Sequence, residues 1–181
     1  MDGLAPQTSA IFEAITRLEC IKPYVLVGGT ALTLQIGTRL SEDLDFMSWR
    51  KSRNEKREVD WPAIKKELDT VGNIEKYDIL DIDHVEFVVD GVKLSFYANP
   101  NYSPLQREIA YLNNLCVADL TAIGAMKMEV MLRRSKFRDY YDIYSLLEAG
   151  IEMQTMNFSA LEPKYNVTPA QIEARIKEAL M

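Results

Sequence analysis

The sequence predicts an α/β fold, a mixed β-sheet flanked by helices and followed by a helical C-terminal part. Three observations predict it. Short apolar runs typical of strands are mixed with helical patterns in the first two thirds of the chain. The dipeptide Asp90-Gly91 separates two such runs, as in a tight hairpin. Only helical periodicity follows from about residue 118. We therefore expect an α/β core over residues 1–117 and a helical part over residues 118–181, packed on the core as one compact unit.

The first elements follow from apolar spacing and from the residues that interrupt it. We expect a helix over 9–21, capped by Thr8 or Ser9 and ended by Pro23, and then a buried strand over 24–27. A turn at Gly28-Gly29, a helix over 30–37 and a strand over 43–46 are expected to follow. Gly37 is placed where a left-handed residue ends a helix. This order predicts a strand–turn–helix unit followed directly by a second strand.

The later elements are predicted in the same way. A polar, basic segment over residues 47–59 is expected to form a long loop or lid. Asp60 is a typical N-cap, and Pro62 fits the first turn of the helix that follows. Beyond it we expect strands over 74–82, 84–89 and 92–97, a loop over 99–104, and helices over 119–134, 137–149 and 168–181.

Composition restricts the class of protein. The chain has 181 residues, of which 48% are apolar and 27% charged, as in ordinary globular proteins. It has no apolar run of about 18 residues, which argues against a membrane span, and its start does not resemble a secretory signal. Its two cysteines, far apart and outside any metal motif, are expected to be free and buried. A cytoplasmic protein is the resulting expectation.

The charge distribution is uneven. The net charge of −6 argues against a general nucleic-acid binder. Two basic runs, over 49–57 and 133–138, nevertheless stand out. They are either solvated surface or local patches that hold a polyanion.

Asp43 and Asp45 are the first candidates for chemistry. Side chains alternate across a strand, so both carboxylates lie on one face, about 6.5 to 7 Å apart at Cα. Carboxylates this close repel each other unless a cation lies between them. Mg²⁺ suits such a pair, because it takes one or two protein carboxylates and completes its shell with water and phosphate oxygens. The alternative is that one of the two pairs with Arg39 and the other with a lysine or solvent.

The glycine turn just upstream favours the metal interpretation. Gly28, Gly29 and Thr30 link a buried strand to a helix, so backbone N–H groups and a helix N-terminus face the same space. Glycine is also common in any tight turn. Strand, Gly-Gly-Thr, short helix and paired aspartates in sequence are more restrictive, and together they predict a phosphate cradle beside a cation site.

The second half of the chain carries further charged candidates. Lys127 falls within the inward stripe of the helix over 119–134, where a lysine must reach the surface or an anion. Asp139 and Asp142 share a face of the following helix, whose Tyr140 and Tyr144 are expected in the core. The two aspartates are either surface partners of nearby arginines or part of a site.

Several of these stretches together resemble a known family. "GGTALTLQIG", an arginine and "SEDLDF", then "VKLSFY", then "VADLTAIGAMKMEVMLRRSKFRDYYDIYSLLE" are similar to the AbiEii/AbiGii toxin family of nucleotidyltransferases. That family belongs to the DNA polymerase beta-like nucleotidyltransferase superfamily. The resemblance covers about residues 22–150, and it implies a nucleotidyltransferase-like mixed sheet with a helical C-terminal part.

The resemblance also implies roles for individual residues. It implies Mg²⁺ or Mn²⁺ bound by Asp43 and Asp45, and catalytic roles for these two, for Lys127 and for Asp139 or Asp142. It implies nucleotide binding by Gly28, Gly29, Thr30, Arg39, Ser41 and Lys127. One departure is apparent: polymerase-like relatives carry a third carboxylate on a later strand, where this chain has Lys93 and Ser95. His84, the one histidine, is interpreted as structural.

The function implied is transfer of a nucleotide from an NTP to an RNA, for example tRNA, or to a protein acceptor. Members of the family are typically toxins of bacterial toxin–antitoxin or phage-defence systems, so a cognate antitoxin is an expected partner. Because the third strand carboxylate is missing, the alternative is a catalytically degenerate module that binds nucleotide or antitoxin.

Overall fold

The computed structural model describes residues 3–52, 58–102, 105, 107–134 and 136–156, together with 170, 171, 174 and 178. The chain divides into two compact units. The first unit comprises Met1–Ser103 and Arg107–Ala118, and the second comprises Pro104–Gln106 and Asp119–Met181.

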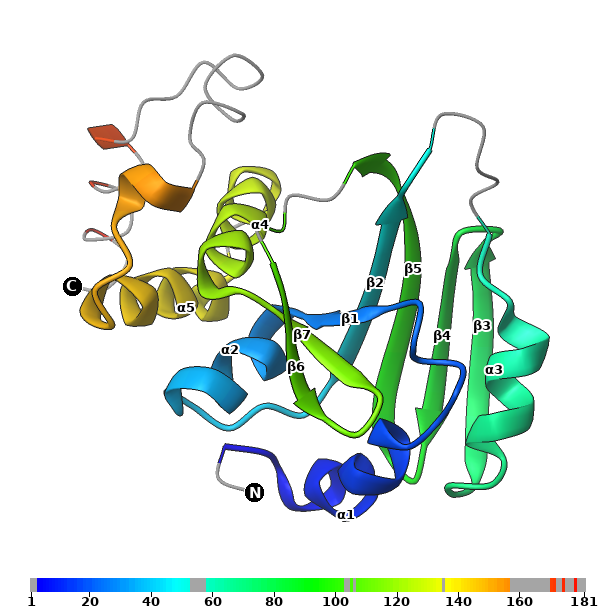
Figure 1. Cartoon of the computed structure of the whole chain (residues 1–181). Helices are drawn as coiled ribbons and strands as arrows, with labels where there is room; N and C mark the ends of the chain where they lie inside the picture. The colour runs from blue at the N-terminus through cyan, green and yellow to red at the C-terminus, as the bar shows by residue number, and fades with distance from the viewer. Residues whose placement is uncertain are drawn as a thin grey trace. The chain divides into compact units, whose positions relative to one another are not determined.

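The first unit is built on a mixed β-sheet (Figure 1). Its elements are α1 (Pro6–Thr16), β1 (Val25–Val27), α2 (Gly28–Ile36), β2 (Leu44–Arg50), α3 (Trp61–Leu68), β3 (Ile74–Asp81), β4 (His84–Val89), β5 (Val92–Tyr102), β6 (Glu108–Leu112) and β7 (Leu115–Ala118). Among the described residues the sheet has seven strands in the order β3-β4-β5-β2-β1-β7-β6. β2 pairs parallel with β5, β1 pairs parallel with β7, and the other neighbours are antiparallel. The predicted mixed α/β fold is confirmed.

The two faces of this sheet differ in character. On one face, aromatic side chains from adjacent strands are in contact: the ring centroids of Phe46 and Phe96 are 4.9 Å apart, and those of Phe87 and Phe96 are 6.1 Å apart. α3 covers the end of this face, where Trp61 stacks on Tyr77. Because side chains alternate along each strand, the residues between these aromatics point to the opposite face. That face carries the charged and hydroxyl side chains.

The second unit contains α4 (Leu120–Arg133), α5 (Phe137–Glu148) and a short 3-10 helix, η1 (Met153–Met156). Asp119 caps α4 by accepting a hydrogen bond from the N–H of Ala122 at 2.9 Å. Gly150 follows α5 with a φ of +81°, the left-handed conformation expected there. Of the helix predicted over 168–181, residues 170, 171, 174 and 178 are helical and the others lie outside the described residues.

Several predicted boundaries are confirmed. Gly37 has a φ of +65° and ends α2. Asp60 accepts a hydrogen bond from the N–H of Ala63 at 3.2 Å and so caps α3. Asp90 and Gly91 both have positive φ, as a type I′ hairpin requires. At each of these positions the residue type suits a particular backbone feature: a left-handed helix end, a helix N-cap or a tight hairpin turn.

Other boundaries were predicted wrongly. α1 begins at Pro6, before the expected cap, and the Thr8 hydroxyl instead donates to the carbonyl of Glu42 at 2.6 Å. β2 continues to Arg50 and β5 to Tyr102, so the predicted loops over 47–59 and 99–104 are partly strand. Residues 53–57, and with them three cations of the first basic run, lie outside the described residues. The hairpin of β6 and β7 was not predicted.

In the part of the chain that the structure describes, no helix combines the length and the hydrophobicity needed to cross a bilayer. Cys20 and Cys116 are free thiols and half-buried rather than fully buried. Burial, followed by the negative charge of Glu67, raises the pKa of Cys20 to about 12. A thiol of this kind is a packing residue and a poor nucleophile at neutral pH.

Candidate functional site

Asp45 is held next to the glycine turn by strand pairing. β1 and β2 are antiparallel, and Val27 is directly opposite Asp45. Leu44 and Phe46 are buried in the core, so Asp45 points to the opposite face. Gly28 follows with a φ of +71°, and a Cβ added to it would lie 2.9 Å from Oδ2 of Asp45. The carboxylate therefore lies against the backbone of the turn, at a place where no side chain fits.

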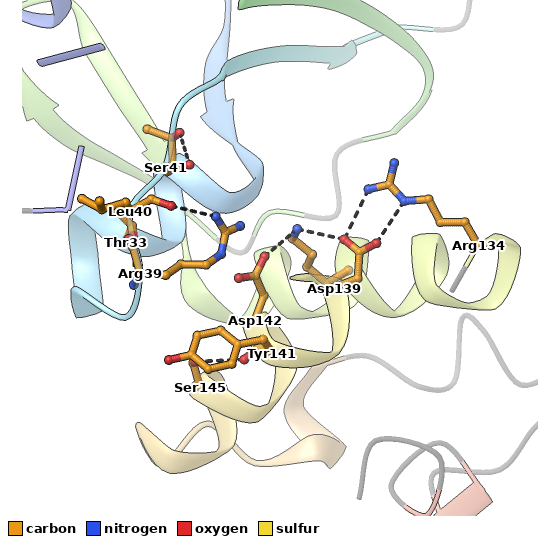
Figure 2. A network of polar contacts seen from close by, with 11 residues as sticks. Thr33, Arg39, Leu40, Ser41, Arg134, Asp139, Tyr141, Asp142 and Ser145 are labelled. Carbon is orange, nitrogen blue, oxygen red and sulfur yellow. Dashed lines mark hydrogen bonds and ion pairs between the residues drawn. The ribbon is translucent and has the colours of Figure 1, made fainter. Parts of the chain in front are cut away.

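Arg39 lies against the second glycine of the turn. A Cβ added to Gly29 would lie 2.2 Å from Nη2 of Arg39 and 3.4 Å from Oγ of Ser41. The guanidinium donates from Nη1 to the carbonyl of Leu40 at 3.1 Å, and the hydroxyl of Thr33 donates to the carbonyl of Arg39 (Figure 2). The turn thus has a carboxylate against one glycine and a guanidinium against the other.

Thr30 and Ser41 are buried inside this arrangement. Their hydroxyl oxygens are 2.7 Å apart, and Thr30 also donates to the carbonyl of Asp43. These contacts fix the chain between α2 and β2, and with it the backbone of Asp43. The two hydroxyls therefore position the acidic pair, and nucleotide binding by them stays a prediction.

The glycine turn is the first turn of α2, because the helix begins at Gly28 and not at residue 30 as predicted. Val27 occupies the N-cap position, and no side chain caps the helix. The first N–H groups of a helix lack intrahelical partners and carry partial positive charge. These N–H groups and the guanidinium of Arg39 lie close together in the first unit, and anion binding by them stays a prediction.

The two aspartates fit a divalent cation. Asp43 is exposed and Asp45 half-buried, so the pair is accessible to an ion. Two carboxylates are the number that Mg²⁺ usually takes from protein, with water and substrate phosphate completing six ligands. In the described ranges, no group of three or more His, Cys, Asp or Glu side chains is placed to hold a metal. The donors present therefore suit Mg²⁺ or Mn²⁺ completed by phosphate oxygens, and not a site closed by protein alone.

A polar row continues from Asp45 across the sheet. Ser95 of β5 is directly beside Asp45, and Glu86 of β4 is directly beside Ser95. The hydroxyl of Ser95 lies 3.2 Å from Nε2 of His84, which supports the structural interpretation of this histidine. Lys93 of β5 is paired with Glu86, with Nζ 2.6 Å from Oε1. The sequence showed the missing carboxylate, but the Lys93–Glu86 pair depends on strand pairing and was not predicted.

The second unit contains a separate network around Lys127. Its Nζ lies 2.7 Å from Oδ2 of Asp142 and 3.1 Å from Oδ1 of Asp139. Arg134 donates from Nε to Oδ2 of Asp139 at 3.0 Å (Figure 2). The side chain of Lys127 is 12% exposed, so its ammonium does not point into bulk solvent. Lys127, Asp139, Asp142 and Arg134 therefore form one network of ion pairs, and a role of this network in nucleotide binding or catalysis stays a prediction.

Both aspartates of α5 are buried, contrary to the orientation predicted for this helix. Tyr144 was expected in the core but is 42% exposed, whereas Asp139 and Asp142 are 1% and 0% exposed. The cations explain the difference, because buried carboxylates are tolerated when they are paired. Burial raises the pKa of Asp139, but the hydrogen bond from Arg134 and the charge of Lys127 outweigh it and lower the pKa overall. Asp139 is therefore ionised at neutral pH.

Comparisons with known proteins were made for the whole chain. The sequence profile of the family described as "Nucleotidyl transferase AbiEii toxin, Type IV TA system" matches residues 10–179. An uncharacterized protein of Aquifex aeolicus (strain VF5) is 26% identical over 150 residues, which are 81% of this chain and 68% of that protein.

Two solved structures share the fold. JHP933 from Helicobacter pylori is similar with a TM-score of 0.51 and 22% identity, over 86% of this chain and 72% of that one. The Megavirus polyadenylate synthase is similar with a TM-score of 0.52 and 12% identity, over 80% of this chain and 32% of that one. At these identities the likeness establishes the fold alone.

Proposed function

The chain belongs to the AbiEii nucleotidyl transferase toxin family of type IV toxin–antitoxin systems. From this premise we propose that it transfers a nucleotide from an NTP to an RNA or protein acceptor. We further propose that Asp43 and Asp45 hold the Mg²⁺ or Mn²⁺ that the reaction uses. Nucleotidyl transfer in a toxin–antitoxin context is what membership of this family implies. The metal, the residues and the acceptor are our proposal.

One observation carries the proposed metal and triphosphate site. The turn at Gly28-Gly29 has the carboxylate of Asp45 against its first residue and the guanidinium of Arg39 against its second. Carboxylates bind the divalent cation of a metal-bound polyphosphate, and guanidinium groups bind its phosphate oxygens.

In the proposed mechanism, each group of the site binds a partner of opposite charge. A divalent cation held by these residues would supply positive charge that stabilises the triphosphate during transfer. Asp43 and Asp45 hold it, while the N–H groups at the start of α2 and the Arg39 guanidinium bind phosphate oxygens. The acceptor oxygen then bonds to the α-phosphorus as the bond to the pyrophosphate oxygen breaks.

The network of the second unit is proposed to contribute to the same reaction. Lys127 is assigned to neutralise triphosphate charge and Asp142 to orient the acceptor hydroxyl or accept its proton. Asp139 is assigned the supporting part, because it binds both Lys127 and Arg134 and so fixes the ammonium.

The test is transfer of label from α-³²P-labelled ATP, CTP, GTP and UTP into bacterial RNA and protein in the presence of Mg²⁺. Asp45→Asn should reduce labelling by roughly a hundredfold or more, because loss of a metal-bound charge costs several kcal/mol of transition-state stabilisation. Asp78→Asn is the matched control, since Asp78 belongs to the same polar row but pairs with Lys76. Labelling undiminished by Asp45→Asn would refute the metal assignment.

The same assay identifies the acceptor and separates the enzyme from a degenerate module. Label in an RNA band or a protein band identifies the acceptor class. A module would be stabilised by a nucleotide with Mg²⁺ or Mn²⁺ and release no pyrophosphate. Family membership supports the enzyme.

A further inference from the structure

β5, the strand beside Asp45, carries the ammonium group of Lys93, which senses the charges of Asp45 and Asp43. In the parallel pairing of β2 and β5, Leu44 is opposite Leu94 and Asp45 is opposite Ser95. Lys93 lies on β5 one residue before Leu94, and Asp43 lies one residue before the start of β2, so that both are at the same end of this strand pair. Alternation places its side chain on the same face as Ser95 and Asp45.

The Lys93 ammonium is paired with Glu86, and the order of the strands determines which member of the ion pair lies nearer to the aspartates. Nζ lies 2.6 Å from Oε1 of Glu86, and the two side chains are 42% and 25% exposed. In the sheet order β4-β5-β2, Lys93 lies between Glu86 and the aspartates. The positive end of the pair is therefore on the strand next to Asp43 and Asp45, and the negative end is one strand farther away.

The negative charges of Asp45 and Asp43 affect the pKa of Lys93. Burial lowers the pKa of the ammonium, but the hydrogen bond and charge of Glu86, followed by the charges of Asp45 and Asp43, raise it overall. Lys93 is therefore a permanent cation beside the acidic pair. The ammonium of Lys93 would repel a second divalent ion bound to Asp43 and Asp45 on the side that faces β5. On that side Ser95 offers a hydroxyl and not a carboxylate as a ligand.

We propose that Lys93, clamped by Glu86, is a positioning residue that limits the Asp43–Asp45 pair to a single divalent cation and weakens its binding in the absence of nucleotide. The proposal rests on the proposed metal role of Asp43 and Asp45. The ammonium acts through charge alone, so an arginine at position 93 preserves the effect and a neutral residue removes it. Glu86 acts in the opposite sense, because it draws the ammonium away from the aspartates.

The test is titration of the purified chain with Mn²⁺ alone at low ionic strength, with free Mn²⁺ measured by electron paramagnetic resonance. The wild type should bind one Mn²⁺ per chain. Lys93→Gln should bind Mn²⁺ about three- to tenfold more tightly, the effect of removing one unit charge several ångströms away in a partly solvated site. Lys93→Arg should match the wild type, and Glu86→Gln should bind Mn²⁺ more weakly.

Two further variants complete the experiment. Lys65→Gln removes a comparable half-exposed lysine, paired with Asp69 on α3, and should leave Mn²⁺ affinity unchanged. Asp45→Asn should abolish the binding; if it does not, the metal assignment of the proposed function fails and this inference fails with it. If Asp45→Asn abolishes binding but Lys93→Gln leaves it unchanged or weaker, or if the wild type binds two ions, the inference about Lys93 alone is overturned.

Discussion

Oδ2 of Asp45 lies so close to the Cα of Gly28 that an added Cβ would be 2.9 Å from it. Asp45 belongs to β2 and Gly28 follows β1, so this contact joins the carboxylate to the turn through the pairing of two strands. The position of the proposed cation and the conformation of the turn therefore depend on each other.

Gly28→Ala should destabilise the protein by about 1–2 kcal/mol, because an L-residue is strained at a φ of +71°. It should also weaken Mn²⁺ binding, because the methyl group displaces the Asp45 carboxylate. Urea denaturation and Mn²⁺ titration measure the two effects. Gly37→Ala is the control: its φ is +65° but no atom lies within 4 Å of the added Cβ, so it should lose stability and keep Mn²⁺ affinity. Equal Mn²⁺ affinity in both variants would contradict the proposed coupling.

Lys127→Met should destabilise the protein by about 3–5 kcal/mol, because it removes the ammonium from two buried carboxylates. Adding Asp142→Asn should restore part of that loss, since one buried charge is then removed as well. A double-mutant cycle from urea denaturation measures the coupling. Arg133→Gln, which breaks an exposed pair with Glu129 on the same helix, should cost less than about 1 kcal/mol. Additive losses for Lys127 and Asp142 would show that the pair is not coupled.

The pKa of Asp139 gives a pH dependence of stability. Because this pKa is lower in the folded chain than in the unfolded one, the carboxylate adds stability at pH values above its unfolded pKa. That contribution should be complete at about pH 6 and should be lost progressively as the pH falls below about 4 and through the lower folded pKa. The free energy of unfolding of the wild type and of Asp139→Asn, measured from pH 7 to pH 3, should therefore converge at the acidic end. A constant difference over this range would contradict the lowered pKa.

Cys20 should react slowly with thiol reagents in the folded state. With a pKa of about 12, little thiolate is present at pH 8. Reaction of the Cys116→Ser variant with a disulfide reagent isolates Cys20, and its rate should increase strongly in urea, where the pKa returns to about 8.5. Equal rates in the folded and unfolded chain would show that the thiol is not buried as described.

The fold could be predicted where single residues have a specific backbone role. Asp60, Gly37 and Asp90-Gly91 marked an N-cap, a helix end and a hairpin, and all three are found. The β6–β7 hairpin was missed because its turn uses Asn113, with a φ of +50°, in place of the usual glycine pair. β6 also lies at the edge of the sheet, with little apolar alternation to reveal it.

The site could be predicted where it is local in the chain. Asp45 lies on β2 and Gly28 directly follows β1, and because these strands are close in sequence the proximity of the two residues follows from the order of elements. The Lys93–Glu86 pair could not be predicted, because the spacing of residues in the sequence does not show which strand lies beside β2. Tyr140 of α5 is in the core as predicted, but Tyr144 is exposed and the two aspartates are buried. This was missed because buried acids are costly unless cations offset them, and Arg134 was not recognised as one of those cations.

The most direct test of the account is a crystal structure with Mn²⁺ and an NTP whose α,β-bridging oxygen is replaced by methylene, measured at a wavelength where manganese scatters anomalously. We predict one anomalous peak bound by Asp43 and Asp45, with triphosphate oxygens at the N–H groups that begin α2 at Gly28 and at the guanidinium of Arg39. Manganese bound elsewhere, or a triphosphate remote from the glycine turn, would contradict the account.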